Sequence, residues 1–173
     1  MKPDTERDYV DFVTHHANAL CRTAYLLCGD WRRAEDSTQE ALIRLYRIWG
    51  RIQRKGSVAA YARKVVVSTT LDGLRRKSAH EVVSAEEHFT GEADSSDPLA
   101  VLENRIVITQ ALAELPPRMR ACVVLRYFDE LSVDETAAVL ECRPGTVKSQ
   151  TLRALEKLRN HPALAALTVG ELA

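Results

Sequence analysis

The sequence of 173 residues has four cysteines, seven glycines, six prolines and no long apolar run. No apolar run approaches the roughly 18 residues of a membrane span, and residues 1–4 are polar with no signal-peptide core behind them. We therefore expect a cytoplasmic protein without membrane insertion. Four cysteines without a CxxC pair are no disulfide framework. Glycine and proline are too scarce for a collagen-like or proline-rich polymer.

The histidines and cysteines form no recognisable catalytic or metal site. None of the five histidines lies at a known catalytic spacing from a serine, cysteine or carboxylate. Cys21 and Cys28 would share a helix face about 10.5 Å apart along its axis, which is too far to bind one metal ion. We therefore expect no enzyme, no catalytic residue, no metal and no cofactor.

Helical periodicity runs through most of the chain and predicts an all-α fold. Apolar residues recur at steps of three and four from Val10 to Leu27, and Gly29 ends this first helix. Further helices are predicted at about 33–49, 58–76, 99–112, 118–128, 132–140 and 146–159. Ser132 and Glu135 are spaced as a capping box, and Pro144 suits the first turn of the last helix. No segment alternates as a half-buried strand does.

The formal net charge of zero conceals a strong pattern along the chain. Ten of the 24 basic residues lie between positions 44 and 77, where Asp72 is the only acid. Residues 78–97 contain six acids and no lysine or arginine, and residues 142–159 are basic again. Basic patches are the usual electrostatic footprint of phosphate binding, although a single one is equally well explained as a solvated helix face.

The composition change at residues 78–97 predicts a flexible acidic linker between two small helical domains. We expect a bundle of three to four helices over residues 1–77 and a second domain over 98–160, which fold separately. A tail follows at 161–173. In the second domain a short helix, a tight turn and a longer basic helix give the outline of a helix-turn-helix motif.

The last predicted helix has one face suited to a DNA major groove. Its apolar residues, such as Val147 and Ala154, fall on one side of a helical wheel. The opposite side carries hydrogen-bonding side chains, none of them acidic, namely Thr146, Ser149, Gln150, Arg153 and Lys157, and Lys148 lies on a flank where it suits a phosphate. An ordinary solvated face is the alternative, which the motif outline disfavours.

The third predicted helix carries an aromatic residue among cations, an arrangement that holds single-stranded bases and their phosphates. Its packing side is expected to include Ala62, Val65 and Thr69. The opposite side and the basic loop before it contain Arg51, Arg54, Lys55, Tyr61, Lys64, Ser68, Asp72, Arg75 and Arg76. The alternatives are a core role for Tyr61 and cations that favour the helix C-terminus.

The second predicted helix presents acids and an apolar residue opposite its core. Asp36, Glu40, Ile43 and Arg47 share this face, which suits a basic partner with Ile43 as the apolar contact. Asp36 and Glu40 are like charges four residues apart, which costs a few tenths of a kcal/mol. The alternative is that acids simply suit a helix N-terminus.

These motifs together resemble the extracytoplasmic-function sigma factors, and most closely their sigma-E-like subgroup. Residues 34–40 (AEDSTQE) resemble the signature of sigma region 2, and residues 60–76 resemble its segment for the promoter −10 element. Residues 115–149, from Leu115-Pro116 to Pro144-Gly145-Thr146-Val147-Lys148-Ser149, resemble region 4, which reads the −35 element. The resemblance covers roughly residues 9–159.

The resemblance implies a sigma factor that binds RNA polymerase core and recognises −10 and −35 elements to start transcription. Docking on the β′ clamp helices is implied for Asp36, Gln39, Glu40, Ile43, Arg44 and Arg47. The third-helix residues named above would capture the −10 strand, and those of the last helix would read the −35 element. The β flap, promoter DNA and an anti-sigma factor are the implied partners of a chain that is a monomer when free.

This chain departs from the family pattern at several positions. Ser68 replaces a usual asparagine, and Glu141 stands where glycine is frequent, at a left-handed turn position that costs a non-glycine residue roughly 1 kcal/mol. Gln150 stands where the family frequently has an arginine, and this glutamine favours adenine over guanine. Thr136 stands where the family usually has an isoleucine.

A helix-turn-helix repressor with a helical dimerisation domain is the alternative function, but it leaves the first half and the linker unexplained.

Overall fold

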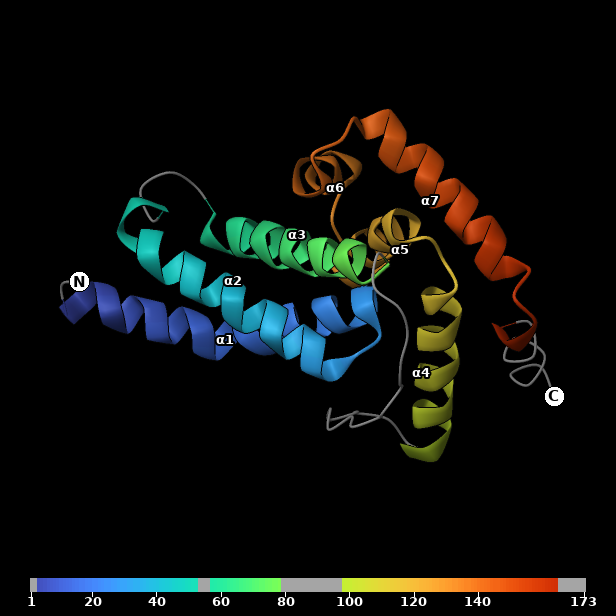
Figure 1. Ribbon diagram of the computed structural model, residues 1–173, viewed down its shortest axis with the longest axis horizontal. Helices are drawn as coiled ribbons and strands as arrows, with labels where there is room; N and C mark the ends of the chain where they lie inside the picture. The colour runs from blue at the N-terminus through green and yellow to red at the C-terminus, as the bar shows by residue number, and fades with distance from the viewer. Residues whose placement is uncertain (1–2, 53–56, 79–97, 165–173) are drawn as a thin grey trace.

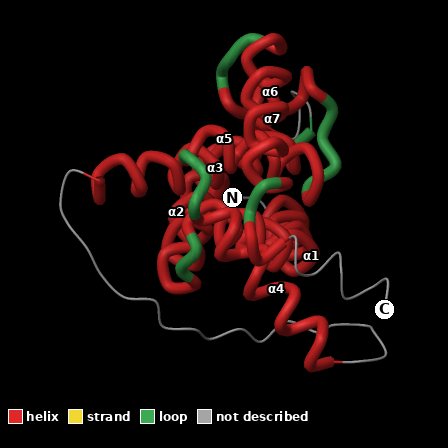
Figure 2. Tube along the Cα trace, turned by 90° about the vertical axis from the view of Figure 1, so that its right-hand side faces the viewer, coloured by secondary structure: helices red, strands yellow, loops and turns green. Residues whose placement is uncertain are grey.

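The computed structural model describes residues 3–52, 57–78 and 98–164, and these residues form helices and loops without a strand (Figure 1, Figure 2). The first half contains α1 (Pro3–Cys28), α2 (Trp31–Ile52) and α3 (Val58–Ser78). The second half contains α4 (Pro98–Ala113), α5 (Pro117–Val123), the π-helical turn η1 (Val124–Phe128), α6 (Val133–Leu140) and α7 (Pro144–Arg159). The predicted all-α class is confirmed.

The three helices of the first half pack around a common core. Periodic apolar residues of each helix meet there, among them Leu20, Leu45 and Val66, which are at most 6% exposed. Gly29 has a φ of 70°, a left-handed conformation that glycine adopts without strain, and its N–H donates to the carbonyl of Tyr25 at 2.7 Å. This turn lets α2 fold back along α1.

An aromatic cluster closes the free end of this bundle. The ring of Trp49 is 2% exposed and lies 5.2 Å, between ring centroids, from both Tyr9 and Phe12. The Tyr9 hydroxyl donates to the carbonyl of Leu42 at 3.0 Å, so its polar end is satisfied in this apolar setting. The cluster fixes α1 against α2 and thereby holds the outer face of α2 in place.

The second half is a helix-turn-helix domain built on the predicted caps. Ser132 accepts a hydrogen bond from the N–H of Glu135 at 3.1 Å, and Glu135 accepts one from the N–H of Ser132 at 2.8 Å. This confirms the capping box at the start of α6, and these bonds hold the pKa of Glu135 below its usual value. Pro144 occupies the first turn of α7, as predicted.

The helix predicted over 118–128 does not run through as an α-helix. It changes at Val124 into a π-helical turn, in which the N–H of Asp129 donates to the carbonyl of Val124 at 3.1 Å. Such a turn widens the helix by one residue and redirects the side chains that follow it. Here Tyr127 and Phe128 stay exposed, while the side chain of Asp129 is directed to the first half.

The two halves lie in direct contact, an arrangement that was not predicted. Leu27 of α1 and Val67 of α3 are at most 1% exposed and belong to the apolar core of the second half, beside residues such as Leu112 and Leu125. Figure 1 shows α5 beside the C-terminal end of α3 and α6 above the middle of α3. The predicted linker lies almost wholly outside the described residues.

Two details of the first half differ from the prediction. Arg51, which is predicted in a loop, lies in the last turn of α2, because this helix continues to Ile52. The buried side of α3 is wider than the packing side predicted from helical periodicity, since Val66, Val67 and Thr70 are also buried. The second half covers α3 on the side of Val67, which periodicity within one helix cannot reveal.

Candidate nucleic-acid and polymerase interfaces

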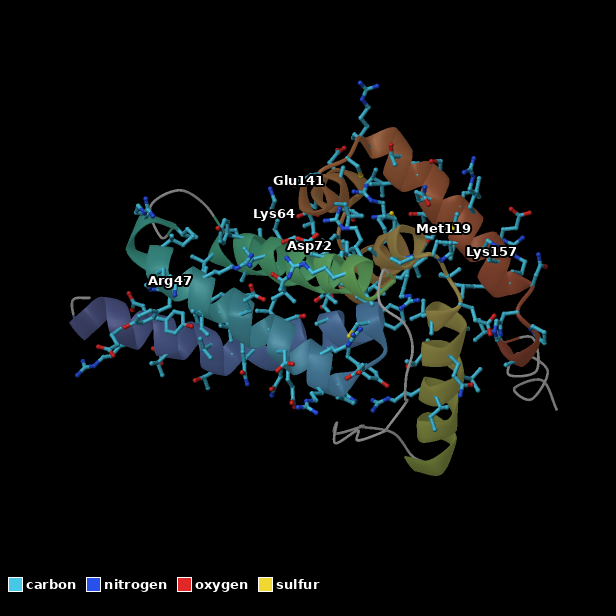
Figure 3. The ribbon with its side chains drawn as sticks, in the orientation of Figure 1. Arg47, Lys64, Asp72, Met119, Glu141 and Lys157 are labelled. Atoms are coloured by element: carbon cyan, nitrogen blue, oxygen red, sulfur yellow. The ribbon has the colours of Figure 1, made fainter. Side chains whose placement is uncertain are left out.

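The predicted reading face of α7 lies on the surface. Val147 and Ala154 are fully buried and anchor the helix on α5 and α6. Five of the predicted residues are exposed and Gln150 is half-buried at the edge of the face; the exposed ones are Thr146, Lys148, Ser149, Arg153 and Lys157. Figure 3 shows Lys157 directed outward from the C-terminal part of α7. The helix therefore offers hydroxyl, ammonium and guanidinium groups to an outside partner.

The turn before α7 has the geometry that the sequence predicted. Glu141 has φ 51° and ψ 48°, the left-handed conformation that favours glycine. Arg143 takes the N-cap position without a side-chain bond to the helix. Pro144 has no backbone N–H, and the N–H of Thr146 donates to the carbonyl of Arg143 at 2.9 Å, so the first turn of α7 depends little on a side-chain cap.

Leu152 is a surface residue of α7 that the sequence analysis missed. Its side chain is 70% exposed, the largest exposure among the large apolar residues of the described chain. On a helical wheel it lies between Lys148 and Ser149, on the flank of the reading face. Its position on the polar side of the helical wheel was the signal in the sequence that this side chain would be exposed.

The polar stripe of α3 lies on the surface, and two of its cations form ion pairs. Tyr61 is 37% exposed and is not a core residue, and Ser68, Arg75 and Arg76 also lie on the surface. Asp72 forms an ion pair with Arg75. Lys64 Nζ lies 2.8 Å from Glu141 Oε1 of the second half, and Figure 3 shows these two side chains between α3 and α6. Arg54 and Lys55 lie outside the described residues.

The outer face of α2 carries all six of its predicted residues on the surface. Asp36, Gln39, Glu40, Ile43, Arg44 and Arg47 are exposed, and Ile43 is 55% exposed. Glu40 and Arg44 form an ion pair on this face. Tyr46, which is 44% exposed and three residues beyond Ile43, extends the apolar part of the face and was not predicted. The face thus combines acids with two exposed apolar side chains.

The cysteines do not form a reactive or metal-binding site in the described part of the chain. Burial raises the pKa of the Cys28 and Cys122 thiols to about 11, so both stay protonated at neutral pH. No group of histidine, cysteine and acidic side chains that could hold a metal ion occurs among the described residues. The described helices also include none long and apolar enough to span a membrane.

A helix-turn-helix with a basic outer face, together with a second helical bundle, is the architecture of a DNA-binding protein. Comparisons with known proteins identify the family. Residues 12–80 match the model of Sigma-70 region 2, and residues 105–158 match that of Sigma-70, region 4. The chain is 35% identical over 152 residues to the RNA polymerase sigma-E factor of Streptomyces avermitilis, covering 88% of this chain and 83% of that protein.

Solved structures share the fold. The extracytoplasmic-function sigma factor SigJ of Mycobacterium tuberculosis aligns with a TM-score of 0.63 and 25% identity, over 94% of this chain and 60% of that chain. The sigma factor RpoE of Bartonella quintana, solved with the anti-sigma factor NepR, aligns with a TM-score of 0.71 and 19% identity, over 88% of this chain and 95% of that chain.

The chain therefore belongs to the extracytoplasmic-function sigma factors of the sigma-70 family, with region 2 in its first half and region 4 in its second. It is a non-enzymatic subunit that directs RNA polymerase to promoters.

Proposed function

We propose that three exposed helix faces divide the work of this sigma factor. The face of α2 docks on the β′ clamp helices of core polymerase, the stripe of α3 captures the −10 strand, and the face of α7 reads the −35 element. The observation that carries the proposal is the chemical difference between these surfaces. The α2 face combines acids and arginines with two exposed apolar side chains, the α3 stripe combines a tyrosine with cations, and the α7 face is polar with cations.

The α7 face suits direct readout of base edges. Arg153 can donate two hydrogen bonds to guanine, and Gln150 can give and accept one each with adenine. Lys148, on the flank, suits a phosphate, which positions the helix without reading sequence. Leu152 suits the methyl group of a thymine, because an apolar side chain is the usual contact for that methyl.

The α3 stripe suits single-stranded DNA. The exposed ring of Tyr61 can stack on a base, while Lys64, Arg75 and Arg76 are placed for phosphates along one side of the helix. Arg51, Arg54 and Lys55 of the neighbouring segment would extend this basic surface. Ser68 is small and exposed at the centre of the stripe, where it leaves room for a base.

Further partners follow from the family. Region 4 would also contact the β flap of polymerase. The sigma factor RpoE was solved with the anti-sigma factor NepR, and CnrH was solved with the cytosolic domain of CnrY. We propose an anti-sigma factor as a partner of the present chain as well. The protein would act in the cytoplasm, where polymerase and promoters are found.

The experiment that tests the docking assignment reverses the charge of the α2 face. The double variant Asp36→Arg with Glu40→Arg should weaken binding to core polymerase at least tenfold and abolish promoter-specific transcription, while the circular dichroism spectrum stays unchanged. Glu6→Arg with Asp11→Arg is the matched control, because both acids are exposed on α1. Core affinity equal to that of the wild type in the α2 variant would refute the assignment.

A second test separates this function from that of a repressor. A sigma factor should bind duplex promoter DNA poorly alone and well together with core polymerase. Tight, sequence-specific binding by the free chain as a dimer would instead support the repressor.

A further inference from the structure

Leu152 lies at the centre of the outward face of α7. Val147 and Ala154 are fully buried and mark the side of this helix that packs on the domain. At about 100° per residue, Leu152 is turned by about 140–160° away from both of them, so it points almost directly outward. Gln150 is turned by only about 60° from Val147, and it is correspondingly half-buried. The residue best placed to meet an outside partner is therefore apolar.

The surroundings of Leu152 indicate what it contacts. The exposed residues three or four positions from it on the helix are Lys148, Ser149 and Glu156, and none of them is apolar. An anchor for another protein usually lies in an apolar patch that excludes water. A single apolar side chain among polar ones instead suits the major groove of DNA, where the base edges carry one kind of apolar group, the methyl on C5 of a pyrimidine.

Glu156 is the only acid of α7, and it lies four residues after Leu152 on the same outward face. It is exposed and forms no ion pair among the described residues, although Arg153 and Arg159 are each three residues away. Side chains four residues apart are neighbours on a helix surface. A carboxylate close to phosphates is unfavourable unless it accepts a hydrogen bond, and the N4 amino group of cytosine is the donor with which a glutamate pairs in the major groove.

We propose that Leu152 and Glu156 form a subsite for 5-methylcytosine in the −35 element. The N4 amino group and the C5 position of cytosine are adjacent on the edge that faces the major groove, so one base can meet both side chains. Leu152 covers the methyl group, and Glu156 accepts a hydrogen bond from N4. Thymine has the same methyl group, but its O4 is an acceptor and faces the carboxylate unfavourably.

This inference rests on the proposed −35 function of α7 and adds a regulatory input to it. Unmodified cytosine lacks the methyl group, so methylation of C5 should strengthen promoter engagement without any change in the base sequence. Burial of one methyl group contributes about 0.8 kcal/mol, which corresponds to about fourfold tighter binding. The helix that reads the sequence would thus also read a modification of it.

The test measures how tightly the holoenzyme, assembled from the full chain and core polymerase, binds duplex promoters. Each pyrimidine position of the −35 element carries cytosine, 5-methylcytosine, thymine or uracil in turn. At one position the wild type should bind 5-methylcytosine about fourfold more tightly than cytosine. It should bind thymine more tightly than uracil by the same factor, because the same methyl group is added in both comparisons.

Substitutions at 152 and 156 assign these effects to side chains. Leu152→Ala should reduce both methyl factors to about one, whereas Leu152→Met keeps an apolar side chain and should retain them. Glu156→Gln should lower the affinity ratio of cytosine to uracil about fivefold relative to the wild type, because an amide can donate to O4 as well as accept from N4. It should also bind every −35 sequence more tightly, since a negative charge near the phosphates is removed. Discrimination then falls while affinity rises, which a folding defect cannot produce.

Val10→Ala and Glu6→Gln are the matched controls, because they make related changes at exposed positions of α1. Both should leave the affinities for all four bases unchanged. Equal binding of cytosine and 5-methylcytosine by the wild type at every position would overturn the inference. The same would follow from a methyl factor in Leu152→Ala equal to that of the wild type, or from a ratio of cytosine to uracil that Glu156→Gln leaves unchanged.

The same measurements distinguish this inference from the proposed function. A holoenzyme whose affinity ignores every base change in the −35 element would overturn the assignment of α7 as the reading helix, and the inference with it. Clear discrimination among the bases without any response to the methyl group would leave that assignment intact and overturn only the 5-methylcytosine subsite.

Discussion

Replacing Thr136 by valine should stabilise region 4. Thr136 is fully buried in α6, and its Oγ1 has no hydrogen-bond partner among the described residues. A buried hydroxyl without a partner costs about 1–3 kcal/mol, and valine has nearly the same shape without this group. The helix propensities of threonine and valine are similar, so the backbone contributes little to the difference. We expect a gain of about 1 kcal/mol in the free energy of unfolding.

Thr70→Val provides a matched control for this change. Thr70 is 3% exposed in α3, and its Oγ1 donates to the carbonyl of Val66 at 2.8 Å. The same chemical change there removes a hydrogen bond and should destabilise the protein by about 0.5–1.5 kcal/mol.

Urea unfolding followed by circular dichroism measures the stability of both variants. The urea concentration at the midpoint should change, while the dependence of the unfolding free energy on urea concentration stays constant. The melting temperature should rise by about 2–4 °C for Thr136→Val. A loss of stability in Thr136→Val similar to that in Thr70→Val would refute the reasoning, because it would mean that the Thr136 hydroxyl is satisfied.

Three further predictions concern DNA reading and pH. Gln150→Arg should change the preferred −35 base at one position from adenine toward guanine, by about 1–3 kcal/mol of binding free energy. Lys148→Ala should instead weaken binding to all −35 sequences equally. Selection from randomised −35 elements checks both variants. Replacing one thymine of the −35 element by deoxyuridine should weaken wild-type binding but not that of Leu152→Ala, and equal losses at every thymine would remove Leu152 from the readout. Burial raises the pKa of Asp129 despite its contacts with Thr23 and Arg63, so the packed arrangement of the two halves binds this proton more tightly than separated halves would and gains stability as the pH falls through that pKa. The radius of gyration of the wild type, but not of Asp129→Asn, should therefore decrease as the pH falls through that pKa, whereas protonation of Glu141, whose pKa is lowered by Lys64, would break the outer pair.

The sequence predicted the local structure well because the signals for it are local. Periodic apolar residues fix the helices, Ser132 and Glu135 fix the start of α6, and Pro144 fixes the start of α7. The exposed faces of α2 and α7 followed from the same periodicity. Leu152 was missed because only polar side chains were considered for the reading face, and 70% of its side chain is exposed.

The contact between the halves was not predictable in this way. Leu27 looks like an ordinary core residue of its own helix, and Val67 lies away from the predicted packing side of α3, where nothing in the neighbouring sequence indicates a partner in the other half of the chain. Asp129 lies in a run of acids that reads as a solvated turn. Its direction depends on the π-helical turn, which arises from one hydrogen-bond shift at Val124 and has no composition signal.

The burial of Cys28 at the end of α1 has a chemical consequence. Burial raises the pKa of this thiol to about 11, against an ordinary value of 9.0. Cys28 packs against the core of the first half, so this burial does not depend on the bond that Arg120 makes to the neighbouring carbonyl of Leu27. The thiolate fraction at neutral pH should therefore stay about a hundredfold below that of an exposed cysteine, and a small alkylating reagent should modify Cys28 only when the first half itself opens.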